Sequence, residues 1–171
     1  MWVIDGYTTA SNYPYSQMSV IERNGTRERL NYIRNSVKVV VDSYNGTVDF
    51  YITDTTDPII MAYKEIYPAL FKTKEEIPQD IAEHFVYPEL LYNIQADMLE
   101  RYHNVKADVL YRSSDVWDRA THTAGQTLRT TGTPIDPYYT MVKTVDSEES
   151  QLGLVLPYTF CLLYTSDAAD D

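Results

Sequence analysis

One segment, residues 37–54 (VKVVVDSYNGTVDFYITD), constrains the fold of this chain more than any other. Its Asn45-Gly46 dipeptide supplies the two residues with positive φ that a type I′ turn needs, and alternating apolar and polar residues flank it. The pattern predicts an antiparallel β-hairpin with strands near residues 37–43 and 48–54.

The predicted hairpin has one apolar face. A two-residue turn places the following side chains together on it: Val39, Val41, Val48, Phe50 and Ile52. It also places Asp42 directly opposite Asp49 on the other, mainly polar face. A one-residue slip in register would move this whole apolar set to the other face. The apolar side chains also need a covering layer, because they would otherwise lie in water. We therefore expect one covered face and one polar face turned outward.

Three helix starts follow the hairpin and supply that layer. Asp57-Pro58 is an N-cap followed by proline at the first helical position, and Pro78 and Pro88 mark two further starts. The third helix carries apolar side chains on one face: Leu91, Ile94, Met98 and Tyr102. The predicted class is α+β, with antiparallel hairpins packed against about three helices.

The C-terminal third adds a weaker signal. Residues 138–145 and 151–157 alternate on either side of an acidic tip, which predicts a second hairpin. The composition, 44% apolar and 23% charged in 171 residues, is that of an ordinary globular chain, so we expect a single domain over residues 1–159. Residues 160–171 (FCLLYTSDAADD) are expected to be a non-native or disordered tail.

Charge and residue types exclude several kinds of site. The net charge of −11 argues against nucleic acid as a partner. The single cysteine excludes a disulfide within the chain and a cysteine-based zinc site. The three histidines are isolated in sequence, and no nucleophile elbow or phosphate-binding loop is present. We therefore predict no catalytic residues, no metal site built on cysteine or histidine, and no cofactor.

The candidate anion site is a locally basic stretch, residues 21–38. Its arginines are Arg23, Arg27, Arg29 and Arg34. Guanidinium groups suit carboxylates and phosphates, so lipid headgroups or an acidic surface of a partner domain are the expected ligands. The alternative is that these arginines pair with carboxylates of the same chain.

The candidate cation site uses Asp42 and Asp49 on the polar hairpin face, with Asp54 or Asp57 nearby. Like charges that face each other across strands need neutralisation, and carboxylate oxygens are the ligands that Ca²⁺ prefers. The alternative is a lysine or arginine partner, or a solvated pair.

Several long segments also carry a family resemblance in collinear order. They are DGYTTASNYPYSQ, NYIRNSVKVVVDSYNGTVDFYI, DPIIMAYKEIYPALF and YPELLYNIQADMLERYH. This pattern resembles the bacterial membrane proteins grouped as uncharacterised protein family 0182, over about residues 1–157. The resemblance implies a bundle of membrane helices followed by a large extracytoplasmic region, and it carries no catalytic residues over.

The resemblance therefore implies that this chain is an internal piece of the extracytoplasmic region of a cell membrane protein. Taken alone, the lack of a segment of about 20 apolar residues would indicate a cytoplasmic chain. The leading hypothesis is a binding or structural module whose partners are the membrane surface or other domains of the same protein. The alternatives are a hydrolase-like or cation-dependent enzyme completed by residues outside this chain, and a soluble cytoplasmic interaction domain.

Overall fold

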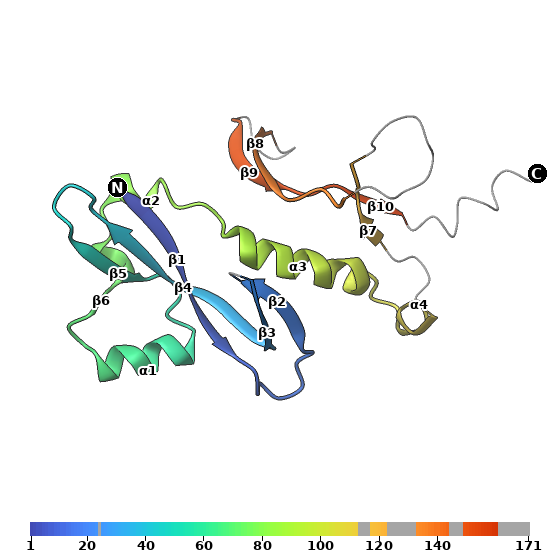
Figure 1. Cartoon of the computed structure of the whole chain (residues 1–171), viewed down its shortest axis with the longest axis horizontal. Coiled ribbons are helices and arrows are strands. Elements are labelled where there is room, and N and C mark those ends of the chain that lie inside the picture. The colour runs from blue at the N-terminus through green and yellow to red at the C-terminus, as the bar shows by residue number, and fades with distance from the viewer. Residues whose placement is uncertain (24, 113–116, 123–132, 144–148, 161–171) are drawn as a thin grey trace, which may run out of the picture. The chain divides into compact units, whose positions relative to one another are not determined.

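The structure is a computed structural model that describes residues 1–23, 25–112, 117–122, 133–143 and 149–160. It separates into two compact units, Met1–Leu91 and Tyr92–Asp171, which are described one at a time. Its mixed helices and antiparallel hairpins (Figure 1) confirm the α+β class. Two compact units can belong to one folding domain or to two. The single domain over residues 1–159 therefore stays a prediction.

The first unit is built on a four-stranded sheet in the order β1-β4-β5-β6. The strands are β1 (Trp2–Ala10), β4 (Tyr32–Val41), β5 (Val48–Ile52) and β6 (Phe71–Lys72). The first three are antiparallel neighbours, and β6 lies parallel to β5. The predicted hairpin is therefore present as β4 and β5, at the centre of a wider sheet.

The register of this hairpin differs from the prediction by two residues. Val41 pairs with Val48, and a six-residue connection, 42–47, replaces the expected two-residue turn. The Asp42 side chain stabilises the longer loop, because it accepts a hydrogen bond from the backbone N–H of Tyr44 at 2.8 Å. A shift of two preserves the alternation of side chains, so the apolar residues still share one face.

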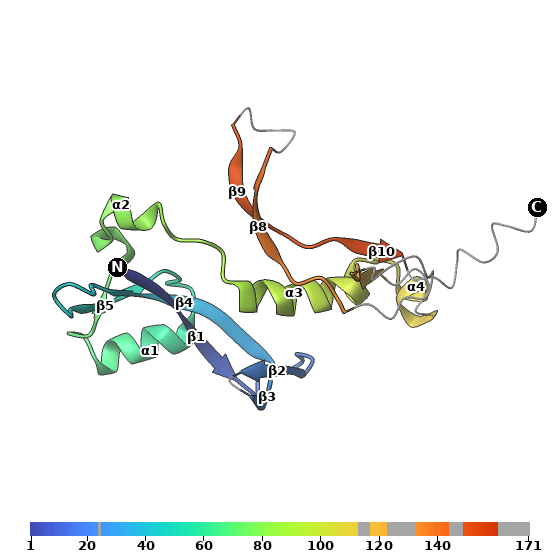
Figure 2. The ribbon, with the colours of Figure 1, turned by 45° about the horizontal axis from the view of Figure 1, so that its top comes forward.

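Helix α1 (Pro58–Ile66) covers that apolar face, as predicted. Val37, Ile52 and Ile60 form the buried core, and Ile52 is only 1% exposed. Four partly buried side chains pack against it: Val39, Phe50, Met61 and Phe71. In both orientations of the ribbon, α1 lies along one side of the sheet (Figures 1 and 2).

The opposite face of the sheet is also covered, so the prediction that it faces outward is wrong. The buried side chains on this face are Lys38, Val40 and Tyr51. Lys38 forms an ion pair with Asp5, and its Nζ donates to the carbonyl of Val86 at 3.1 Å. The Phe85 ring centroid lies 5.8 Å from the same ammonium group. The segment that follows α2 (Gln79–Ala82) therefore packs over this face.

A second hairpin in the first unit, which the sequence pattern did not predict, joins β2 (Ser19–Arg23) to β3 (Thr26–Leu30). Ile21 and Leu30 are buried, at 7% and 4% exposed. The short 3-10 helix Lys74–Glu76 precedes α2.

The second unit contains most of α3 (Glu89–Tyr102), the helix predicted after Pro88. The other elements are α4 (Ala107–Arg112), β7 (Trp117–Arg119), β8 (Tyr138–Val142), β9 (Gln151–Val155) and β10 (Tyr158–Phe160). The antiparallel β8–β9 pair confirms the predicted C-terminal hairpin. Most of its acidic tip, and nearly all of the predicted tail, fall on residues 144–148 and 161–171, outside the described residues.

Polar and aromatic contacts fix the antiparallel β7–β10 pair to α3. The Arg119 guanidinium donates to the Asn93 side chain at 2.8 Å and forms ion pairs with Asp97 and Glu100. The Trp117 ring stacks on His103, with centroids 4.1 Å apart. Burial is the main reason that the pKa of Glu100 is raised; the nearby Asp97 charge adds to this effect, and Arg119 opposes it.

Candidate functional site

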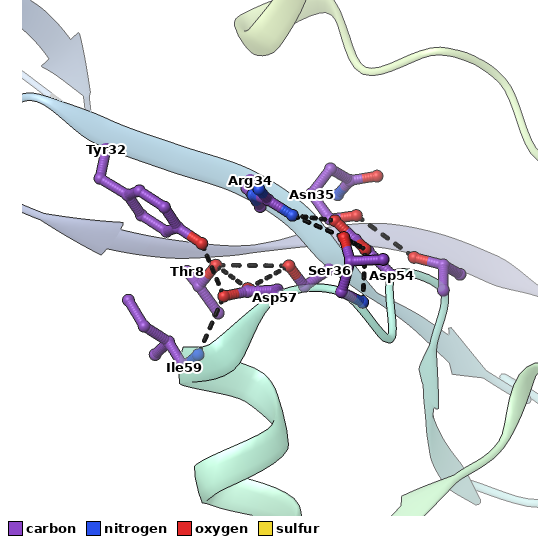
Figure 3. Close-up of polar contacts among 10 residues, drawn as sticks. Thr8, Tyr32, Arg34, Asn35, Ser36, Asp54, Asp57 and Ile59 are labelled. Carbon is purple, nitrogen blue, oxygen red and sulfur yellow. Dashed lines mark hydrogen bonds and ion pairs between the residues drawn. The ribbon is translucent and has the colours of Figure 1, made fainter. Parts of the chain in front are cut away.

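The buried carboxylate of Asp57 is the centre of a polar network that joins β1, β4 and α1 (Figure 3). Its Oδ2 accepts hydrogen bonds from the hydroxyls of Thr8, at 2.5 Å, and Ser36. Its Oδ1 accepts from the Tyr32 hydroxyl at 2.8 Å and from the backbone N–H of Ile59 at 2.9 Å. Because a carboxylate offers about four acceptor positions, these four donors saturate it.

An irregularity between β1 and β4 brings these donors together. Gly6 pairs with Val37 and Thr8 pairs with Arg34, so one β1 residue faces two β4 residues between these pairs. Such a bulge changes which side of the sheet the following side chains face. Tyr32, before the irregularity, and Ser36, within it, both donate to Asp57 at the start of α1, whereas Val37 beyond it joins the apolar core under the same helix.

The hydrogen bonds keep Asp57 ionised despite its burial. Burial alone would raise the pKa of Asp57, but the donors Ser36, Thr8, Tyr32 and Ile59 together hold it below the ordinary value. Conversely, burial, and then the hydrogen bond to Asp57, raises the pKa of Tyr32 to about 12. At neutral pH the pair is therefore a charged acceptor and a neutral donor, an arrangement suited to holding α1 on the sheet.

A second part of the network, next to Asp57, contains residues from both predicted sites. Arg34 donates from one nitrogen to Asp54 Oδ2 at 3.1 Å and to Thr56 Oγ1 at 2.8 Å. The guanidinium carbon lies 5.7 Å from the Tyr32 ring centroid, and Tyr13 stacks on the same Tyr32 ring, with centroids 5.2 Å apart. One anion-site candidate and one cation-site candidate thus neutralise each other.

The remaining arginine candidates lie on another element. Arg27 and Arg29 are exposed on β3, two residues apart and so on one face of that strand. The side chain of Arg23 falls outside the described part of the structure. Arg34 lies on β4, where it pairs with Asp54, and the four-arginine site stays a prediction.

The remaining carboxylate candidates have partners of their own. Asp49 faces Val40 across the strands, so the predicted direct opposition of Asp42 and Asp49 is wrong. Lys72 Nζ lies 2.8 Å from Asp49 Oδ1, and the Tyr44 backbone N–H is the main reason that the pKa of Asp42 is lowered. Within the described ranges, no group of three or more His, Cys, Asp or Glu side chains is placed to hold a metal ion. The cation site stays a prediction.

Sequence reasoning identified Asp57 as an N-cap but missed its long-range partners. The N-cap signal is local, in the dipeptide Asp57-Pro58, whereas Thr8 lies 49 residues away in the chain. The contact between Thr8 and Asp57 depends on the register of β1 against β4 and on the irregularity in that pairing. Neither feature can be recognised from neighbouring residues in the sequence.

Replacing Asp57 with alanine is expected to lower the free energy of unfolding by about 3 kcal/mol or more, because it removes the N-cap and leaves the Thr8 and Ser36 hydroxyls without their acceptor. Asp54→Ala, which breaks a partly exposed ion pair, is the matched control and should cost about 1 kcal/mol or less. Urea denaturation measures both. Equal losses in the two variants would contradict a central role for Asp57.

The raised pKa of Tyr32 predicts a specific alkaline response. Stability from a protonated Tyr32 is fully present below its ordinary pKa of 10.0 and is lost as pH rises through about 12. The difference in unfolding free energy between the unmodified chain and Tyr32→Phe should therefore shrink between pH 10 and 12. A difference that stays constant across this range would show that the hydroxyl does not titrate in contact with Asp57.

Comparisons with known proteins add the family context. The model of a family described as "Uncharacterised protein family (UPF0182)" matches residues 1–162. A UPF0182 protein of Caldicellulosiruptor saccharolyticus is 46% identical over 162 residues, covering 93% of this chain and 16% of the relative. Relatives from Desulfitobacterium hafniense and Microcystis aeruginosa are each 41% identical over 158 residues, covering 92% of this chain and 15% of each relative.

No solved structure matches the chain. None of the helices in the described residues combines the length and apolar character that crossing a membrane requires. The extent of the family match and the identity to several relatives together establish that this chain, which spans about a sixth of the length of those relatives, belongs to the uncharacterised protein family UPF0182.

Proposed function

We propose that this chain is a structural and binding module in the extracytoplasmic region of a multi-pass bacterial membrane protein. The saturated Asp57 carboxylate is the observation that carries the structural part of this proposal. A general base or a metal ligand needs an open acceptor position, whereas all four positions of Asp57 accept donors from the chain itself. The extracytoplasmic location rests on the family resemblance.

Other charged groups support the same role. Ion pairs within the described residues include Arg34–Asp54, Lys38–Asp5, Lys72–Asp49 and Arg119–Asp97. Each joins residues from different segments, so these charges hold elements together. Such ion pairs within each of the two units suit the presentation of surface side chains to a partner.

The location can be tested by cysteine labelling in a full-length protein that contains this segment, after its native cysteines are replaced by serine. A Tyr44→Cys variant should react with a membrane-impermeant maleimide in intact cells stripped of their wall, because Tyr44 is 97% exposed. Ile52→Cys is the control, since a side chain 1% exposed should react only after denaturation. Labelling of Tyr44→Cys only after cell lysis would place the module in the cytoplasm.

A second candidate function, binding of an anionic headgroup, is favoured by the exposed face of β3. Arg27 and Arg29 lie on this face, and Val20, the cross-strand partner of Arg29, is 62% exposed. Two guanidinium groups beside an exposed aliphatic side chain match a phosphate headgroup above the first carbons of a lipid. Arg34 lies on β4 and does not belong to this smaller arginine set.

Binding to vesicles that contain phosphatidylglycerol should test this function. At about 1 kcal/mol per arginine near the surface, Arg27→Gln combined with Arg29→Gln should weaken binding roughly 30-fold at low salt. The control Arg34→Gln removes the same charge from a different strand, β4, and should change binding little. Equal binding by the double variant and the unmodified chain, or no binding by either, would contradict the headgroup proposal.

A further inference from the structure

The two edges of the four-stranded sheet are protected to very different degrees. One edge is β6, which has only two residues. The other is β1, which has nine residues and, in the part of the chain that the structure describes, pairs with β4 alone. A long edge strand presents a row of backbone N–H and C=O groups that can pair with another strand.

Apart from the irregularity between Gly6 and Thr8, strand β1 has few of the features that prevent such pairing, and its stretch from Trp2 to Gly6 pairs regularly with β4. Its sequence, WVIDGYTTA, contains neither lysine nor proline. Its one charged side chain, Asp5, is engaged by Lys38 of the neighbouring strand. Nothing in the side-chain chemistry of β1 therefore opposes the addition of a strand, whereas the opposite edge is protected by its short length.

Apolar side chains continue up to this open edge. Trp2 and Ile4 are 68% and 51% exposed, although their cross-strand partners Val41 and Val39 belong to the apolar face under α1. Val48, which pairs with Val41 from the other side, is 47% exposed. The apolar surface thus extends past the area that α1 covers and ends at the edge strand.

We propose that a strand of the parent polypeptide, from outside this chain, adds to the edge of β1 and packs apolar side chains against Trp2 and Ile4. The chain spans only 15–16% of the length of the relatives described above, so most of each parent protein is available to supply the strand. A segment of the same polypeptide is held at high effective concentration, which favours it over a separate partner. Its main-chain hydrogen bonds supply affinity and its alternate side chains supply specificity.

This inference does not depend on the membrane location or on headgroup binding, because it uses a different strand and different side chains. The added strand should alternate, with apolar residues on the side of Trp2 and Ile4. It would convert β1 from an edge strand into an interior strand of a five-stranded sheet.

Hydrogen exchange with residue-level fragmentation, carried out on a full-length parent protein, tests the proposal. At an open edge, every second β1 amide lacks a strand partner and exchanges rapidly, whereas an added strand should slow these amides at least tenfold. Rapid exchange at alternate β1 amides in the parent protein would overturn the proposal. Protection that disappears on dilution from dimer to monomer would also overturn it, because a second copy would then be the occupant.

A pair of matched variants gives an independent readout. Ile4→Lys in the parent protein should speed exchange of the protected β1 amides at least tenfold, because the lysine would lie against the apolar side chains of the added strand. Ile66→Lys makes the same substitution at a similarly exposed position on α1 and should leave β1 exchange unchanged. Equal exchange of the β1 amides in both variants would contradict the proposed packing.

Discussion

The first unit depends on one buried charge that its own chain neutralises. An ionised carboxylate without partners would be too costly to bury, so Asp57 is tolerated only because donors from β1, β4 and α1 converge on it. The same four hydrogen bonds fix the start of α1 over the sheet. The position of α1 in turn determines which apolar side chains form the core, with Val37 and Ile52 covered and Trp2 left exposed.

Local patterns in the sequence were sufficient to predict several helices and strands, but not the contacts between elements that are distant in the chain. The hairpin, the Asp57-Pro58 helix start and the helix after Pro88 were all predictable, because turn residues, caps and periodicity act over a few positions. The hairpin register was not predictable, because the Asp42 side chain stabilises a longer loop than Asn45-Gly46 alone requires.

The polar contacts were harder to predict, because each depends on how distant strands align. Lys38 lies on the hairpin face that was expected to turn outward, yet residues 85–86 cover it and Asp5 pairs with it. Arg34 and Asp54 were assigned to two different candidate sites, and the structure joins them to each other. In both cases a charge that suggests a ligand in sequence has an internal partner in the fold. The surfaces proposed to meet partners are the face of β3 that carries Arg27 and Arg29 and the edge of β1.

Native-state hydrogen exchange at the backbone amide of Ile59 tests the role of Asp57 most directly, because this N–H donates to Asp57 at the first turn of α1. If the network holds the unit together, the Ile59 amide should exchange only through global unfolding, with the same opening free energy as the amide of the buried Ile52. An Ile59 amide that exchanges through local fraying, far faster than Ile52, would show that the sheet and α1 do not depend on this carboxylate.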